Sequence, residues 1–209
     1  RIAKNGHKII IPHHTSTNKA KLRLLGTTGQ VIPLQFKNLQ DKKILNLIDK
    51  ADIIINLKTL WDEKRTSYSK GILNFNTQLV DLIKKNKHKQ LFIYFSGLGM
   101  DNKINSRRTN AIFQSEKYIE KSLINSCIIR PGIIIGGDDK FLKGLLPLFK
   151  ISFFIPIFGD GLKKFQPVYI DDVSIAINKI MESKSKGHHL YEFVGPEIYT
   201  YREFYNFIS

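Results

Sequence analysis

The chain has 209 residues, of which 42% are hydrophobic, enough to fold as one substantial globular domain. Its single cysteine, Cys127, excludes a disulfide framework and agrees with a reducing compartment; its apolar surroundings predict a buried, inert thiol. The formal net charge is +15, but the lysines are spread over every expected helix and loop. That spread favours no specific nucleic-acid partner, whereas weak attraction to anionic lipid headgroups remains open.

Short apolar runs rich in β-branched residues indicate parallel strands that are buried on both faces of a sheet. These runs are Lys8–Pro12, Val31–Phe36, Asp52–Leu57, Leu91–Phe95 and Cys127–Ile135. Amphipathic segments between them predict helices at Asn18–Leu25, Leu39–Asp49, Tyr68–Lys85 and Asn110–Ser122. Because strands and helices alternate, we expect an α/β fold with a doubly wound parallel sheet of the Rossmann type.

After Gly137 the pattern changes to helices with short strands, which predicts the start of a small α+β C-terminal lobe. Residues 1–137 are therefore expected to form the Rossmann domain and residues 138–209 a partial lobe, with 165–182 packing back on the first domain. Helix caps are predicted at Asp138 or Asp139, at Asp171 and Asp172, and at Thr200 with Glu203. We prefer caps to a metal site, because no histidine or carboxylate stands at ligand spacing from these aspartates.

Three phrases of the sequence resemble one family. They are Ile128–Leu142, Lys164–Ile177 and Leu190–Phe204. Together they resemble the extended, atypical short-chain dehydrogenase/reductases of the NAD-dependent epimerase/dehydratase superfamily. Among these, the chain is most similar to the dehydrogenase-like accessory subunit of respiratory complex I (NADH-ubiquinone oxidoreductase) and its bacterial relatives. The resemblance implies an NAD(P)-binding fold.

The family opens with a strand and a Gly-rich phosphate loop, and neither precedes Lys8 in this chain. A pyrophosphate site needs such a turn at a helix N-terminus. The first strand of a dinucleotide fold lies at the centre of the sheet. We therefore expect a gap beside Lys8–Pro12 and interpret the chain as a fragment that lacks the first strand and the Gly-rich loop.

The resemblance also implies positions for the cofactor. They are His14, Asn56, Leu57, Ser96, Arg130, Pro131 and Gly132. His14 follows the second family strand, where a carboxylate would bind the ribose diol of NAD(H). Its absence favours NADP(H), provided that the upstream phosphate loop is present. An alternative is that His13 and His14 are simply two surface histidines in a loop.

Short-chain dehydrogenases use a tyrosine and a lysine four residues later for proton transfer. Aligning Ser115–Leu123 with the family places Ile112 at the tyrosine position and Glu116 at the lysine position. Isoleucine carries no proton, and a glutamate would repel a phenolate. The sequence therefore predicts no catalytic residue, with Ser96 as a candidate remnant, and Tyr118 is not expected to be a general acid.

The resemblance and the missing catalytic pair together predict a non-catalytic structural or assembly role. The expected partners are a dinucleotide and respiratory complex I or the membrane surface. The expected location is cytoplasmic, peripheral on the inner face of the membrane. Two alternatives stay open: an active NAD(P)-dependent sugar-nucleotide epimerase or reductase, and a non-functional gene fragment.

Overall fold

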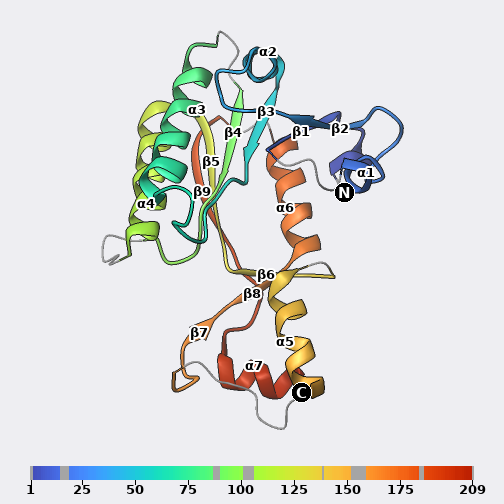
Figure 1. Ribbon diagram of the computed structural model, residues 1–209, viewed down its shortest axis with the longest axis vertical. Helices are drawn as coiled ribbons and strands as arrows, with labels where there is room; N and C mark the ends of the chain where they lie inside the picture. Colours follow the sequence, from blue (N-terminus) through green and yellow to red (C-terminus); the bar gives the residue numbers. More distant parts are fainter. Residues whose placement is uncertain are drawn as a thin grey trace.

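The computed structural model describes residues 2–14, 19–86, 90–100, 106–137, 139–151, 159–183 and 186–208. A larger lobe contains the main sheet and its helices, and a smaller lobe holds the C-terminal end of the chain (Figure 1). The two lobes meet at a narrow waist where β6 (Ile133–Ile135) pairs in parallel with β8 (Pro167–Tyr169).

The main sheet has four parallel strands in the order β3-β4-β5-β9. They span Ile53–Asn56, Leu91–Phe95, Asn125–Pro131 and Gly187–Phe193. One face is covered by α3 (Asn74–Lys84) and α4 (Arg107–Ser122), and the other by α6 (Ile170–Glu182) (Figure 1). A π-helical turn, η2 (Ser69–Leu73), leads into α3. Helices on both faces of a parallel sheet confirm the predicted doubly wound α/β class.

The core lies on the two faces of the central strands. Successive side chains of a strand point to opposite faces. Accordingly, Phe92 and Tyr94 of β4 pack with α3 and α4, while Ile93 packs with α6. Cys127 of β5 is 1% exposed, and burial raises the pKa of its thiol to about 11. A thiol with that pKa is protonated at neutral pH, which agrees with the predicted inert core cysteine.

The first two strands form a separate parallel pair. β1 (Ile9–His13) pairs with β2 (Val31–Gln35), in the register Ile9↔Val31. The pair is accompanied by η1 (Ile2–Asn5) and α1 (Lys19–Arg23), whereas the buried residues of α2 (Lys42–Lys50) belong to the core cluster of α3 and α4. Within the described residues neither strand pairs with β3, so the predicted gap in the sheet is confirmed. The prediction that β1 is buried on both faces is wrong, because a two-stranded sheet leaves its strands half-covered.

The apolar run Cys127–Ile135 was expected to be one strand, and that prediction is wrong. β5 ends at Pro131, and β6 joins a different sheet. Gly132 stands between them, and its backbone amide donates to the carbonyl of Phe193 at 2.9 Å. A Cβ atom on Gly132 would lie only 2.0 Å from the Gln166 carbonyl oxygen. The break follows from this tertiary crossing, which hydrophobic periodicity alone does not reveal.

The smaller lobe contains α5 (Lys140–Ile151), β7 (Lys164–Phe165), β10 (Tyr199–Thr200) and α7 (Tyr201–Ile208). Aromatic rings form its interior: Phe204 packs against Phe141, Phe165 and Tyr199 with centroid distances of 5.1–5.9 Å. No helix in the described parts of the chain has the length and apolar content that a membrane crossing requires.

Two of the three predicted helix caps are present. Asp139 accepts from the amide of Leu142 at 2.6 Å, whereas Asp138 lies outside the described residues. Thr200 and Glu203 form the reciprocal capping box. The cap expected at Asp171 and Asp172 is wrong: α6 begins at Ile170, directly after β8, so both aspartates lie in its first turn. There their charges complement the helix dipole instead.

Candidate functional site

The candidate site is the carboxyl edge of the parallel strands, where open α/β sheets bind their ligands. The sequence-predicted cofactor positions lie at or just after these strand ends. His14 follows β1, and Ser96 follows β4. Asn56 ends β3 and Leu57 follows it, while Arg130 and Pro131 end β5 and Gly132 follows them. The structure therefore brings them to carboxyl ends, but divides them between two sheets.

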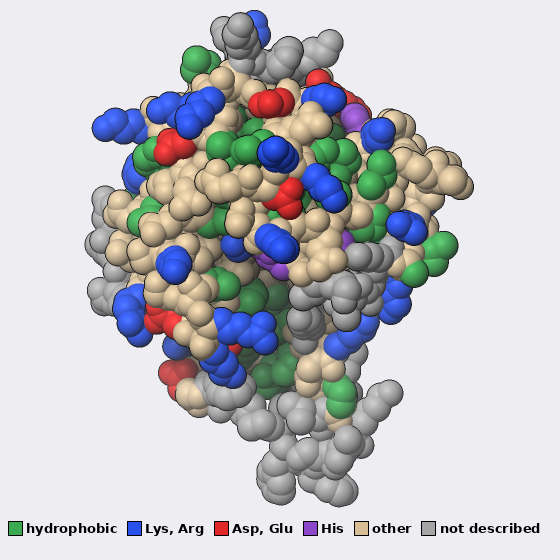
Figure 2. Space-filling view, turned by 45° about the horizontal axis from the view of Figure 1, so that its top comes forward, with side chains coloured by type: hydrophobic (Ala, Val, Ile, Leu, Met, Phe, Trp, Pro, Cys, Tyr) green, Lys and Arg blue, Asp and Glu red, His purple; other side chains and the backbone are tan. Residues whose placement is uncertain are grey.

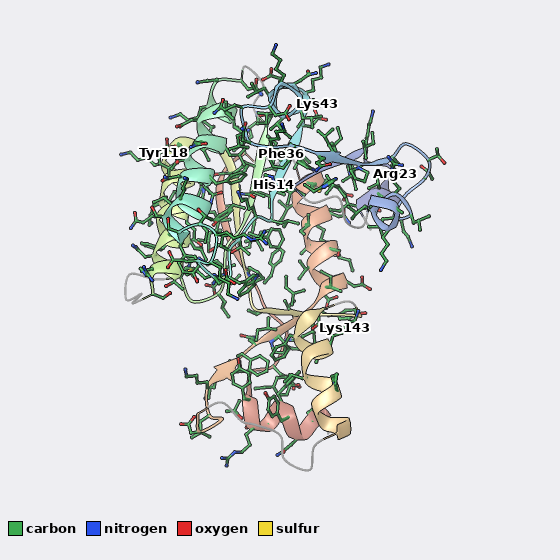
Figure 3. The ribbon with its side chains drawn as sticks, in the orientation of Figure 1. His14, Arg23, Phe36, Lys43, Tyr118 and Lys143 are labelled. Carbon is green, nitrogen blue, oxygen red and sulfur yellow. The ribbon has the colours of Figure 1, made fainter. Side chains whose placement is uncertain are left out.

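His14 links the ends of the first strand pair. Its ring centroid is 4.2 Å from that of Phe36, and its Nδ1 lies 3.2 Å from the Phe36 carbonyl oxygen (Figure 3). The neighbouring His13 has both ring nitrogens buried, without a hydrogen-bond partner among the described residues. The alternative of two surface histidines is therefore wrong for His13, while His14 is exposed at the edge.

At the end of β3, the side-chain amide of Asn56 makes hydrogen bonds to other residues of the protein. Its Nδ2 donates to Asn76 at 2.6 Å, and its Oδ1 accepts from the amide of Lys58 at 3.0 Å. Leu57 is 66% exposed. The Lys58 side chain turns onto α3, where its ammonium lies 3.6 Å from the Phe75 ring centroid. Only Leu57 of the two predicted contact residues therefore presents its side chain to solvent.

A buried ion pair joins α4 to the ends of β4 and β5. Arg130 donates to both carboxylate oxygens of Glu116, from Nε at 3.0 Å and from Nη2 at 2.6 Å. The Ser96 hydroxyl donates to the same carboxylate. Glu116 is 3% exposed, so its charge is almost entirely removed from water. Ser96, one of the expected cofactor positions, is thus hydrogen-bonded to Glu116.

The rest of the inward face of α4 carries no acid–base pair. Ile112 is buried, and the Ser115 hydroxyl donates back to the Ala111 carbonyl at 2.7 Å. Tyr94, on the facing strand, has its pKa raised to about 12 by burial, so its phenol stays neutral at physiological pH. Tyr118 lies on the outer side of α4, where its hydrogen bond to Asp81 at 2.6 Å raises its pKa (Figure 3).

Arg108 is a residue near this edge that the sequence did not single out. Its Nε donates to the Leu60 carbonyl at 2.7 Å, and its Nη2 to the Thr59 hydroxyl at 3.2 Å. Its guanidinium also lies 4.4 Å from the ring centroid of Trp61, which is 79% exposed. The contact joins residues that are almost fifty positions apart, so no local pattern announces it.

On the face drawn in Figure 2, the basic side chains have no single focus. Figure 2 shows lysine and arginine side chains scattered over the visible face, with acidic and apolar side chains between them. Such a distribution does not form the continuous stripe that nucleic-acid backbones require. Among the described residues, no three histidine, cysteine or carboxylate side chains lie together as a metal site.

By sequence, the chain is similar to subunits of one mitochondrial enzyme. It is 29% identical over 206 residues to NADH dehydrogenase (ubiquinone) 1 alpha subcomplex subunit 9 of Arabidopsis thaliana, which covers 97% of this chain and 51% of the relative. The Dictyostelium discoideum subunit is 28% identical, covering 99% and 58%. The chain is a distant relative of these NADH dehydrogenase subunits. It spans about half the length of the curated relatives that it matches. No protein-family model matches the chain.

By structure, this relative of the subunit 9 proteins resembles sugar-nucleotide enzymes. It superimposes on UDP-glucuronic acid 4-epimerase from Bacillus cereus, solved with UDP-glucuronic acid and NAD, with a TM-score of 0.78 and 17% identity, covering 99% of this chain and 76% of the other. For the dTDP-glucose 4,6-dehydratase DesIV from Streptomyces venezuelae, solved with NAD, the TM-score is 0.81 at 14% identity, covering 96% and 70%. These likenesses establish the NAD(P)-binding fold.

Proposed function

We propose that the protein is a structural or assembly component of a respiratory NADH dehydrogenase of the complex I type, and not a turnover enzyme. The observation that carries the proposal is the buried, bidentate ion pair between Glu116 and Arg130. It lies on the face of α4 where the family resemblance places the proton-transfer pair. The sequence likeness to the subunit 9 proteins supplies the partner.

Removing two charges from water costs several kcal/mol, and only close geometry with additional hydrogen bonds recovers this cost. Glu116 meets that condition with three donors, two from Arg130 and one from Ser96. A carboxylate held in this way is compensated for its burial, but it is acceptor-only and cannot assist a phenolate. The carboxyl ends of β4 and β5 are therefore fixed for packing, which suits a scaffold.

A dinucleotide fits one part of this edge better than the other. The exposed His14, with no carboxylate in its place, suits a 2′-phosphate and supports NADP(H). Arg130 and Ser96, by contrast, are already bonded to Glu116. The similar solved enzymes hold NAD, and the preference for NADP(H) is our proposal. The 209 residues contain no Gly-rich phosphate turn after a strand, so we expect them to bind dinucleotide weakly.

The second candidate is an active sugar-nucleotide epimerase or dehydratase, which the fold likeness favours. That reaction requires a group that exchanges a proton near neutral pH, positioned beside a cofactor. Ile112 is apolar, Tyr94 has a pKa of about 12, and Tyr118 lies outside the site. The described side chains therefore support the scaffold role over catalysis.

Membranes from the organism that carries this chain provide the test. An affinity-tagged copy should comigrate with NADH:ubiquinone oxidoreductase activity on native gels after mild detergent extraction, and deletion should lower the amount of that complex. A copy that migrates alone, with unchanged complex after deletion, would contradict the proposal. Turnover of UDP-glucuronic acid by the purified protein with added NAD would favour the enzyme instead.

A further inference from the structure

An open surface depression with a volume of about 360 Å³, called the cavity below, lies between the segment after β3 and the start of α3. The side chains of Lys58 and Phe75 face each other in it. Its volume is in the range of small-molecule sites, which run from roughly 300 to 1,000 Å³. None of the residues that line it belongs to the Glu116–Arg130 ion pair.

Within the described ranges, Lys58 is a cation without a neighbouring anion. Burial lowers the pKa of its ammonium, because desolvation disfavours the charged form. Its recorded contact is with the π face of Phe75. Among the described residues, no carboxylate lies within 4.0 Å of the ammonium of Lys58 or of Lys70. A partly desolvated cation of this kind is stabilised when an anion enters beside it.

The other lining residues supply a second cation and neutral hydrogen-bonding groups. Lys70 and Ser69 belong to the π-helical turn η2, a feature that often marks functional positions. Ser67 precedes the turn, and Asn74 and Gln78 follow on α3; all line the cavity. No acidic side chain is among the described residues that line it. The wall therefore offers donors to an anion and no repelling charge.

We propose that this cavity binds a small phosphorylated molecule. The ammonium groups of Lys58 and Lys70 would bind the phosphate, and the hydroxyls of Ser67 and Ser69 would donate to its remaining oxygens. A phosphate suits two cations and several donors, since it carries nearly two negative charges and three strong acceptor oxygens. The cavity is larger than a bare phosphate, so an organic part of about sugar size fits beside Asn74 and Gln78.

The site is tested by titrating the 209-residue protein with ribose 5-phosphate at constant ionic strength, followed by calorimetry and phosphorus NMR. Ribose is the uncharged control, and NADPH tests whether the phosphate must come from a dinucleotide. Lys58→Met should weaken ribose 5-phosphate binding about tenfold or more, the loss of one charged hydrogen bond. Lys43→Met, at an exposed lysine on α2, is the matched control and should leave binding unchanged (Figure 3).

Equal weakening by Lys58→Met and Lys43→Met would show non-specific attraction to a basic surface and overturn the site. Binding of NADPH without any binding of ribose 5-phosphate would also overturn it. Lys70→Met and Ser69→Ala provide second variants, and each should weaken binding in the same direction. Comigration with the NADH dehydrogenase should be unaffected by Lys58→Met, so this site and the scaffold role can fail separately.

Discussion

The carboxylate of Glu116 on α4 and the guanidinium of Arg130 on β5 meet through two hydrogen bonds, at 3.0 and 2.6 Å. Glu116 is almost fully buried, and the side chain of Arg130 is 16% exposed. Arg130 also lies 3.8 Å from Glu192 on β9, which extends the contact to the edge of the sheet. One helix and two strands are therefore held by a single cation.

Breaking this pair should destabilise the protein strongly. Removing one partner of a buried ion pair costs about 3–5 kcal/mol, because the other charge stays buried and uncompensated. We expect Glu116→Ala and Arg130→Ala each to lower the free energy of unfolding by that amount in urea titrations. The double variant Glu116→Leu/Arg130→Met should lose less than the sum. Lys117→Ala, which removes an exposed pair with Glu120, is the control and should cost at most about 1 kcal/mol. Single-variant losses below 1 kcal/mol would show that the pair is unimportant.

Gly132→Ala should also destabilise the fold. The added methyl group would lie 2.0 Å from the Gln166 carbonyl oxygen, so the waist between the lobes would have to shift. Overpacking of this kind costs about 1–3 kcal/mol. Gly137→Ala is a suitable control, because nothing lies within 4 Å of its added Cβ. Thermal unfolding of both variants measures the difference, and equal transition temperatures would contradict the close crossing.

The capping box at α7 predicts a dependence on pH. Hydrogen bonds from the amide and hydroxyl of Thr200 lower the pKa of Glu203. A lowered pKa in the folded state means that the contribution to stability is present above the ordinary glutamate pKa and is lost as the pH falls through the lowered value. Carboxyl NMR titration should show this shift. Thr200→Ala should raise the pKa of Glu203 only part of the way to its ordinary value, because the hydroxyl donor is lost while the backbone amide donor remains, and should weaken the helix by about 1 kcal/mol. An unshifted Glu203 in the unaltered protein would exclude the box.

Hydrogen exchange should separate the two sheets. Ile93 and Ile129 lie in the buried central strands, whereas Ile10 of β1 is only half-covered. Backbone amides exchange when a segment of the protein opens, and the free energy of opening differs between segments, from near zero up to the free energy of global unfolding. We expect amides of β4 and β5 to exchange at least about a hundredfold more slowly than those of β1 and β2, measured by mass spectrometry. Equal protection would indicate that both sheets open together, against the separation of the strand pair.

Much of the fold was accessible from sequence because parallel strands buried on both faces leave continuous apolar runs. Leu91–Phe95 was predicted with its observed limits, and the capping box at Thr200 carries its own local signature. The division of Cys127–Ile135 into two strands was missed, since it depends on the distant Gln166 backbone. Long-range contacts of this kind leave no period in the sequence.

The site was predictable in part. Pattern and resemblance identified Glu116 as an unsuitable partner for a phenolate, but not its pairing with Arg130, fourteen residues away. The sequence also could not predict that the Lys58 side chain packs on α3, because that contact depends on where the fold places Phe75. Arg108 was missed because its partners, Thr59 and Leu60, are joined to it only by the folded chain.

The pairing of β5 with β9 has a consequence during synthesis. Asn125 lies beside Gly187, 62 residues later, and the segment from β6 to α6 has to be made between them. At ribosomal rates of about 5–20 residues per second, the outer edge of β5 waits roughly 3–12 s for its neighbour. Unpaired strand edges recruit other chains. The nascent protein is therefore most vulnerable to association in the interval between the emergence of Pro131 and that of Phe193, and a chaperone that covers a strand edge would act in that interval.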